Sequence, residues 1–187
     1  GNAYNIDALH TSCQMAMLLK DTPYALSESA VDNLANSLLA FRQYSGKYDV
    51  SRGLCGRFPN QLNTLLGNMP AFAYLYEVLE GEMKDRIGGA FCRLYDPAYS
   101  GVMDNTVKDV KSDIYFHGGM QTVQLMNALK AKDLTDDEMS ESNRTYPYAA
   151  MQVHRRGEWM AAVKGYSKYV WDFETNSGQN WLGRNQS

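Results

Sequence analysis

Apolar residues recur at helical spacing through the first two thirds of the chain. In residues 9–20, Leu9, Cys13, Met17 and Leu18 lie near one face of a predicted helix. A second helix is predicted over residues 30–44, with apolar positions at Val31, Leu34, Ala35, Leu38, Ala40 and Phe41. Ser27 or Ser29 can cap its start, because a serine hydroxyl accepts a hydrogen bond from an otherwise unpaired backbone N–H.

Two more helices are predicted over residues 61–82 and 83–96, after a loop that contains three glycines and a proline. Pro70 falls inside the first of them and predicts a kink or a break, since proline has no backbone N–H to donate. Paired helices joined by loops indicate helical hairpins. The chain shows no fixed-period repeat, which argues against a short-repeat solenoid.

The pattern changes near residue 146, after which β-branched and aromatic residues dominate. The sequence "RRGE" at residues 155–158 fits the turn of a hairpin that joins "AMQVH" to "WMAAVKGY". The preceding stretch, "KAKDLTDDEMSESNRTY", is charged and polar and predicts an exposed linker.

These patterns predict an α+β fold in three parts. Residues 1–132 are expected to form a helical domain and residues 133–145 a linker. Residues 146–187 are expected to begin an antiparallel β domain.

Composition narrows the classes of partner. The chain has 187 residues with a net charge of −3, and this mild acidity argues against nucleic acid. No apolar run approaches the roughly 20 residues that a membrane span needs, so no membrane is expected as a partner. The chain begins "GNAYNIDALH", without an initiator Met or a basic segment, and its N-terminus is expected to be cut.

The sequence offers no metal or thiol chemistry. Cys13, Cys55 and Cys92 are widely spaced and form no CxxC pair, so we expect free or buried thiols. There is no HExxH motif and no EF-hand loop. No cofactor is therefore expected in this part of the chain.

Three segments occur in order along the chain: "LLKDTPYALSESAVDNL", "GRFPN" and "VHRRGEWMAAVKGYSKYVWDFE…GRNQS". Together they resemble polysaccharide lyase family 8, and most closely its chondroitin sulfate ABC lyase branch. The resemblance implies a helical (α/α) toroid followed by a β-sandwich domain, with the substrate cleft between them. Such lyases are several times longer, so it implies an internal piece: the end of the toroid and the first antiparallel strands. It also implies a secreted or periplasmic bacterial protein.

The resemblance implies an acidic polysaccharide as the substrate, namely chondroitin or dermatan sulfate, with hyaluronan as a further candidate. The family cleaves by β-elimination, which removes the C5 proton of a uronic acid. This step needs a neutralised carboxylate, a base near C5 and an acid near the bridging O4. No cofactor is implied, and a structural divalent cation would lie elsewhere in the longer enzyme.

Three residues match catalytic positions of the family. Arg57, in "CGRFPN", aligns with the arginine of Gly-Arg-His-Pro, although Phe58 replaces the histidine; its planar guanidinium suits a carboxylate. Tyr4, in a shortened "GNAY", aligns with the final tyrosine of His-Glu-Gly-Asn-Tyr-Pro-Gly-Tyr and would act as base or acid, while the family histidine would precede Gly1. Glu174 aligns with the acid of Val-Trp-Ser-Ser-Glu and would orient Arg57. Each could instead be an ordinary residue: a surface arginine, a terminal aromatic or an exposed strand-end glutamate.

Further residues are candidates for contact with substrate: Asn2, Asn60, His117, His154, Arg155 and Trp181. For His154 and Arg155, solvated charges at a hairpin turn are favoured over contact with sulfate groups, and for His117 a loop histidine is favoured. Trp181, in a polar loop, is the best candidate for stacking on a sugar ring. Trp159 and Trp171 are expected in the core.

Three hypotheses remain open from the sequence. The first is a segment of a glycosaminoglycan lyase, inactive on its own because the family histidine and most of the cleft lie outside it. The second is a non-catalytic carbohydrate-binding relative, which the shortened "GNAY" keeps open. The third is a helical fragment without a ligand. A histidine shortly before Gly1 would favour the enzyme.

Overall fold

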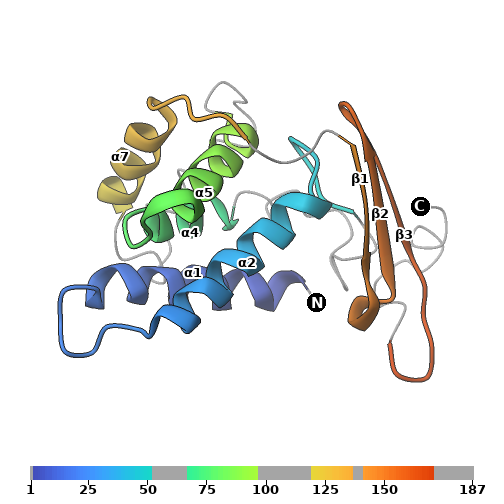
Figure 1. The fold of residues 1–187 in the computed structure, drawn as a ribbon, viewed down its shortest axis with the longest axis horizontal. Helices are drawn as coiled ribbons and strands as arrows, with labels where there is room; N and C mark the ends of the chain where they lie inside the picture. Colours follow the sequence, from blue (N-terminus) through green and yellow to red (C-terminus); the bar gives the residue numbers. More distant parts are fainter. Residues whose placement is uncertain (1, 52–66, 97–118, 137–140, 171–187) are drawn as a thin grey trace.

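The computed structural model describes residues 2–51, 67–96, 119–136 and 141–170. They form a layer of helices and a three-stranded antiparallel sheet on one side of it (Figure 1). The helices are α1 (Asn2–Leu19), α2 (Glu28–Tyr44), α4 (Met69–Tyr76), α5 (Gly81–Leu94) and α7 (Gly119–Lys130). The strands are β1 (Glu141–Tyr146), β2 (Met151–Arg156) and β3 (Trp159–Lys164), with a 3₁₀ turn at Pro147–Ala149. The predicted α+β class is confirmed for these residues; the toroid and the sandwich stay predictions.

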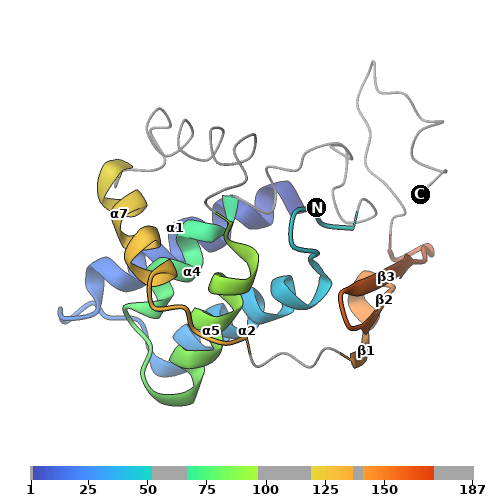
Figure 2. The same ribbon diagram turned by 90° about the horizontal axis from the view of Figure 1, so that it is seen from above.

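Helix α4 is the centre of the helical layer. Its sequence "MPAFAYLY" is almost wholly apolar, and all eight residues are buried. A helix that is apolar on every side must be covered on every side, and α1, α2, α5 and α7 all contact it (Figure 2). The core therefore lies among the helices and not in the sheet.

The helix boundaries follow from local chemistry. The cap predicted for α2 is confirmed at Ser27, whose Oγ accepts from the Ala30 N–H at 3.3 Å. The break predicted at Pro70 is also confirmed, because α4 begins at Met69 with the proline in its first turn. The missing N–H of Pro70 costs no helical hydrogen bond there.

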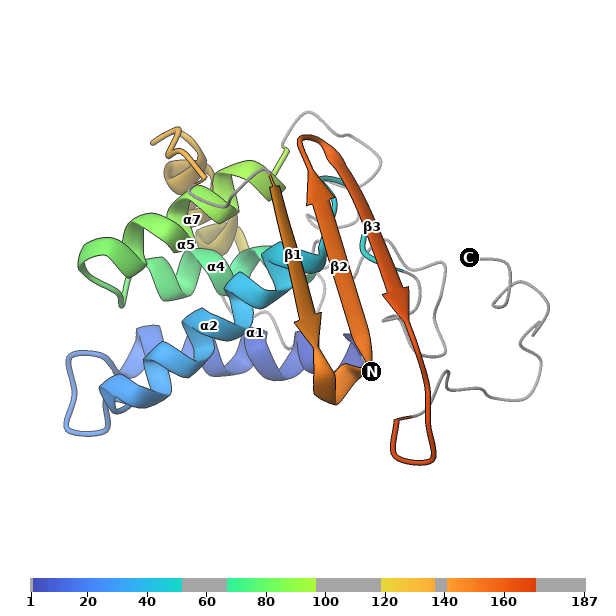
Figure 3. The ribbon, with the colours of Figure 1, turned by 45° about the vertical axis from the view of Figure 1, so that its right-hand side comes forward.

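The predicted hairpin is confirmed in β2 and β3, but its turn is shorter than the predicted "RRGE", because Arg155 and Arg156 are paired residues of β2. Arg156 pairs with Trp159 across a tight turn in which Gly157 has φ +57°, a conformation that glycine adopts without strain. Side chains of β2 alternate between burial and exposure, so Met151, Val153 and Arg155 face the helices. Figure 3 shows the three strands next to one another, with β1 on the side of α2.

Strand β1 corrects the predicted linker. Residues 133–145 were expected to be an exposed connection, but Glu141–Tyr146 pairs with β2 over its whole length. The sequence "ESNRTY" is polar because β1 is an edge strand that remains mostly exposed. Edge strands of this kind show no apolar alternation that a pattern could detect.

Two apolar residues lie elsewhere than predicted. Leu18 is 60% exposed, because Leu9, Cys13 and Ala16 define the buried face of α1 and Leu18 points away from it. Trp159, expected in the core, is 59% exposed at the start of β3. None of the helices in the described parts of the chain is long and apolar enough to cross a membrane.

Candidate functional site

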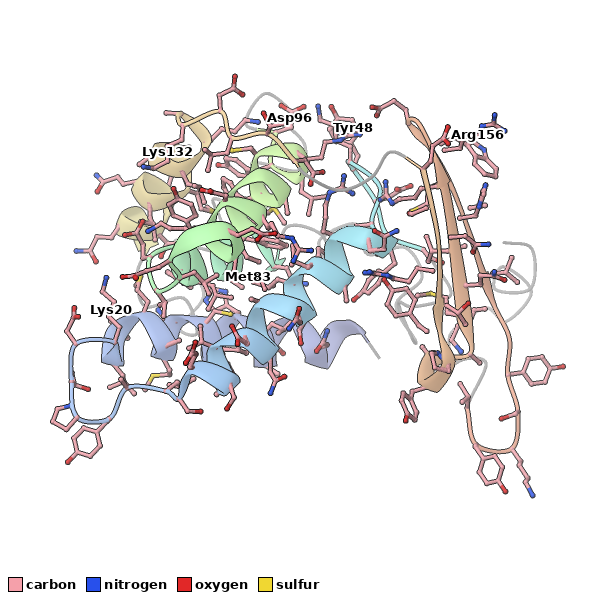
Figure 4. The ribbon with its side chains drawn as sticks, viewed as in Figure 1. Lys20, Tyr48, Met83, Asp96, Lys132 and Arg156 are labelled. Carbon is pink, nitrogen blue, oxygen red and sulfur yellow. The ribbon has the colours of Figure 1, made fainter. Side chains whose placement is uncertain are left out.

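An open groove of about 450 Å³ lies where the helical layer meets the sheet. One wall is the segment that follows α2, and the other is formed by the β2–β3 turn and β3. The lining residues are Gly46, Lys47, Tyr48, Asp49, Val50, Ser51, Glu158, Met160 and Ala162. Figure 4 shows Tyr48 and Asp96 at this end of the molecule, between the helices and the sheet.

The first wall is held by its own backbone. Ser45 and Val50 form a β-bridge, and the Gly46 N–H donates to the Asp49 carbonyl at 2.8 Å. Val50 is buried, which anchors this wall on the core. The segment therefore presents its polar side chains to the groove from a folded backbone.

Side chains tie the same wall to the end of α5. The Tyr48 hydroxyl donates to Asp96 Oδ2 at 2.7 Å, and Lys47 Nζ lies 3.9 Å from the same oxygen. The Lys47 ammonium also lies 5.5 Å from the centre of the Tyr48 ring. A cation and a phenol are thus oriented at the rim of the groove.

The second wall is tied to α5 by an ion pair. Arg93 Nη2, in the last turn of α5, lies 2.5 Å from Glu158 Oε2 in the β2–β3 turn. Because the Glu158 side chain is 89% exposed, this pair contributes little to stability. It does place one negative charge at the rim.

Arg155, the cross-strand partner of the lining residue Met160, corrects an expectation. It was expected to be a solvated charge or a contact for sulfate, but it is only 7% exposed. Its guanidinium donates to the carbonyl oxygens of Gln43 at 2.8 Å, of Arg42 at 3.3 Å, and of Ser45. Because β2 turns this side chain toward α2, Arg155 joins the sheet to the helices and leaves little surface for a ligand.

His154 lies on the opposite face of the sheet. It is exposed, between the buried Val153 and Arg155, and its ring meets Trp159 edge-on at 5.8 Å. The groove is lined instead by Met160 and Ala162, which alternate with this face. The structure therefore does not bring His154 into the groove, and its contact with substrate stays a prediction.

The other candidates are only partly described. Asn2 and Tyr4 lie in the first turns of α1, whose N-terminal end is on the sheet side of the helices (Figure 2). Arg57, Asn60, His117, Glu174 and Trp181 lie outside the described residues, as does Trp171. The expected convergence of Tyr4, Arg57 and Glu174 therefore stays a prediction.

The described residues contain neither a reactive thiol nor a group of metal-binding side chains. Cys13 and Cys92 are free and buried, and burial raises the pKa of the Cys13 thiol to about 12. Burial also raises the pKa of Cys92 above its ordinary value. Among residues 2–51, 67–96, 119–136 and 141–170, no group of three His, Cys, Asp or Glu side chains could hold a metal ion.

Sequence reasoning missed the wall that precedes Arg57. The signal was the polar stretch "SGKYDVS", which joins the amphipathic helix α2 to the segment containing "CGRFPN". A loop with a lysine, a tyrosine and an aspartate beside a candidate catalytic arginine is a reasonable part of a binding site. Its position opposite β3 could not be read from the pattern.

Comparison with known proteins identifies the helical part. The family model described as "Lyase, catalytic" matches residues 2–95, which contain α1, α2, α4 and α5 and the first wall of the groove. The chain is 24% identical over 185 residues to a chondroitin sulfate ABC exolyase of Bacteroides thetaiotaomicron, covering 97% of this chain and 18% of that protein.

A second relative aligns with nearly the same part of this chain. The chain is 24% identical over 184 residues to a chondroitin sulfate ABC endolyase of Proteus vulgaris, covering 98% of this chain and 16% of that protein. The chain thus spans less than a fifth of the length of either relative. No solved structure matches it significantly. The resemblance drawn from the sequence is confirmed, and the chain belongs to the family of lyase catalytic domains.

Proposed function

We propose that this chain is part of a polysaccharide lyase that cleaves uronic-acid-containing glycosaminoglycans by β-elimination. The observation that carries the proposal is the match of residues 2–95 to the lyase catalytic family, with chondroitin sulfate ABC lyases aligned to nearly the whole chain. Chondroitin and dermatan sulfate are the proposed substrates, and hyaluronan is a further candidate.

We propose that the groove between the helical layer and the sheet is a part of the substrate cleft. Its first wall ends at Ser51, and the segment that carries Arg57 starts at the next residue. Asp96, tied to that wall through Tyr48, directly precedes the segment that carries His117. The segment with Arg57 thus follows directly on this wall, and the segment with His117 follows on a residue hydrogen-bonded to it.

In the proposed reaction Arg57 neutralises the uronate carboxylate, which makes the C5 proton more acidic. A base takes that proton, the electron pair forms the C4–C5 double bond, and the bond from C4 to the bridging oxygen breaks. Tyr4 serves as the base or as the acid that protonates the leaving oxygen, and Glu174 orients Arg57. No cofactor takes part in these steps.

The larger architecture is proposed on the same grounds. The helices would belong to an (α/α) toroid and the sheet to a β-sandwich domain, with the cleft between them. Because the substrate is a large extracellular polymer, we propose a secreted or periplasmic location.

The alternative is a non-catalytic carbohydrate-binding relative. The shortened "GNAY" is the observation that keeps this alternative open beside the enzyme. Such a protein would bind the polysaccharide in the same groove and leave it intact.

The test uses the full-length protein that contains this sequence. β-Elimination leaves an unsaturated uronate that absorbs ultraviolet light, so a rise in absorbance with chondroitin sulfate is the expected result. Arg57→Ala should abolish the rise and leave the fold intact by circular dichroism. Arg156→Ala, on the far face of the sheet with a side chain 78% exposed, is the control and should retain activity.

Two results would oppose the proposal. Absence of the ultraviolet signal with every glycosaminoglycan tried, together with retained binding, would establish the non-catalytic alternative. Near-normal turnover in Arg57→Ala would remove Arg57 from the site.

A further inference from the structure

We propose that Arg155 is a positioning residue that caps the C-terminal end of α2 from β2 and thereby sets the separation of the two walls of the groove. Its effect on catalysis rests on the proposed function. Its effect on the structure of the groove does not.

The contacts come from residues far apart in the chain. Arg155 Nε donates to the Gln43 carbonyl at 2.8 Å, and Nη2 donates to the Arg42 carbonyl at 3.3 Å and to the Ser45 carbonyl. These three carbonyls belong to the last turn of α2 and its C-cap. The sheet thus adds hydrogen-bond donors at a helix end where the Ser45 N–H already donates to the Arg42 carbonyl at 3.4 Å and the Ser45 hydroxyl to the Phe41 carbonyl at 2.7 Å.

Helix chemistry explains why an arginine suits the position. The last four carbonyls of a helix have no partner within it, and they carry the negative end of the helix dipole. A guanidinium offers five N–H donors in a rigid plane and stays charged, so one side chain can reach several carbonyls. A lysine offers three donors on a single nitrogen and matches this arrangement less well.

Neighbouring contacts also hold the joint, by which we mean the contact of the C-terminal end of α2 with β1 and β2. Gln43 Nε2 donates to Ser142 Oγ in β1 at 2.5 Å, and the Tyr146 hydroxyl donates to the Ala40 carbonyl at 3.5 Å. The Tyr44 and Tyr146 rings meet edge-on at 5.9 Å. Arg155, 7% exposed, is the buried charged side chain that reaches from the sheet to this helix end.

Both walls of the groove start within a few residues of the joint. The first wall, Gly46–Ser51, follows Ser45, whose carbonyl accepts from Arg155. The second wall begins at Glu158, three positions after Arg155. The exposed pair of Arg93 and Glu158 ties the second wall to α5 and holds weakly. The contacts of the buried guanidinium lie next to the start of both walls and therefore set the distance between them.

The experiment compares Arg155→Met, Arg155→Lys and the control Arg156→Met in the full-length protein. Arg156 is the adjacent arginine on the opposite face of the sheet, so its loss leaves the joint intact. Hydrogen–deuterium exchange should be faster at residues 45–51 in Arg155→Met and unchanged in α1 and α4. Arg155→Lys should give an intermediate result, and it also serves as the folded variant if Arg155→Met does not fold.

Activity gives a second readout. A misplacement on the order of 1 Å can cost about 100-fold in rate, so kcat/KM for chondroitin sulfate should fall by about that factor in Arg155→Met. In Arg155→Lys it should fall by roughly tenfold on the same basis. KM should rise in both variants, whereas loss of folded protein alone would lower the apparent kcat and leave KM unchanged.

The outcomes separate the two proposals. Unchanged exchange at residues 45–51 in Arg155→Met, or an equal rise throughout the protein, would overturn the positioning role. If the parent protein releases no unsaturated product, the proposed function fails, and the exchange data still decide the role of Arg155.

Discussion

Arg42 shows how a single buried charge is accommodated in this protein. It lies in the last turn of α2 and is 5% exposed, and its guanidinium pairs with Asp136, which follows α7. Arg42 Nε lies 2.8 Å from Asp136 Oδ2. The pair joins two segments that are 94 residues apart in the sequence. Breaking it should therefore lower the stability of the helical layer as a whole.

Asp136→Asn should lower the free energy of unfolding. Removing one partner of a buried pair costs roughly 3–5 kcal/mol, and we expect about 2–3 kcal/mol because Asp136 retains some exposure and Arg42 has further contacts. Urea denaturation measures the change. Asp133→Asn is the matched control, since Asp133 is exposed and asparagine tolerates its φ of +48°. Equal effects of the two variants would contradict the prediction.

Cys13 gives a prediction with a defined pH window. Its thiol ionises near pH 9.0 in an unfolded chain, and burial raises its pKa to about 12 in the folded protein. Between these values the unfolded state has lost the proton and the folded state retains it, so the free energy of unfolding falls as pH rises. Below pH 9 both states are protonated and the contribution is constant.

The measurement compares the wild type with Cys13→Ala by urea denaturation at several pH values above 8. The free energy of unfolding should fall more steeply with pH in the wild type than in the variant. Parallel curves would show that Cys13 ionises alike in both states.

At the scale of elements, α5 packs unusually close to the segment that follows α7. A Cβ on Gly89 would collide with the backbone of Thr135, and one on Gly88 would collide with Leu134 and Tyr76. Both glycines are buried. The approach places Asp136 where it reaches Arg42, so the small residues of α5 determine a contact made by other elements.

Gly89→Ala should destabilise the protein despite the better helix propensity of alanine. The added methyl meets backbone, which cannot rotate away, and overpacking of this kind costs about 1–3 kcal/mol. Chemical denaturation gives the value. Asp85→Ala, at an exposed site of the same helix, should change stability by less than about 0.5 kcal/mol. A stabilised Gly89→Ala would show that residues 134–136 can move away freely.

Elements also differ in how well the sequence predicts them. Helix α2 was predicted with its cap, because Ser27 and the apolar spacing that follows act locally. Strand β1 was missed, because its polar residues gain strand structure only from pairing with β2. Trp159 was assigned to the core because its size favours burial, whereas the register of β3 turns it outward.

At the scale of the whole molecule, the groove exists only because segments more than a hundred residues apart meet. Its charged lining residues are Lys47, Asp49 and Glu158. An acidic polysaccharide would be attracted by the first and repelled by the other two. The balance of charge at this rim should therefore affect the affinity for an acidic polysaccharide, and the effect should depend on salt concentration.

On the proposed function, Glu158→Gln in the full-length protein should lower KM for chondroitin sulfate about two-fold at low ionic strength, the scale of one exposed charge. The effect should vanish at high salt, where exposed charges are screened. Glu141→Gln is the matched control, since Glu141 is 73% exposed on the far face of the sheet. The same shift in both variants would show that net charge, and not the groove, is responsible.

The sequence by itself determined the α+β class, the caps and breaks of the helices, the β2–β3 hairpin and the lyase family. These rest on local periodicity, on capping chemistry and on short ordered motifs, all of which act within a few residues. Only the tertiary structure decided that Arg155 is buried against α2, that β1 is a strand, and that Gly46–Ser51 faces β3 across a groove. These outcomes depend on which segments pair and on the register of a sheet, and a shift of one residue would turn Arg155 to solvent and His154 toward the helices.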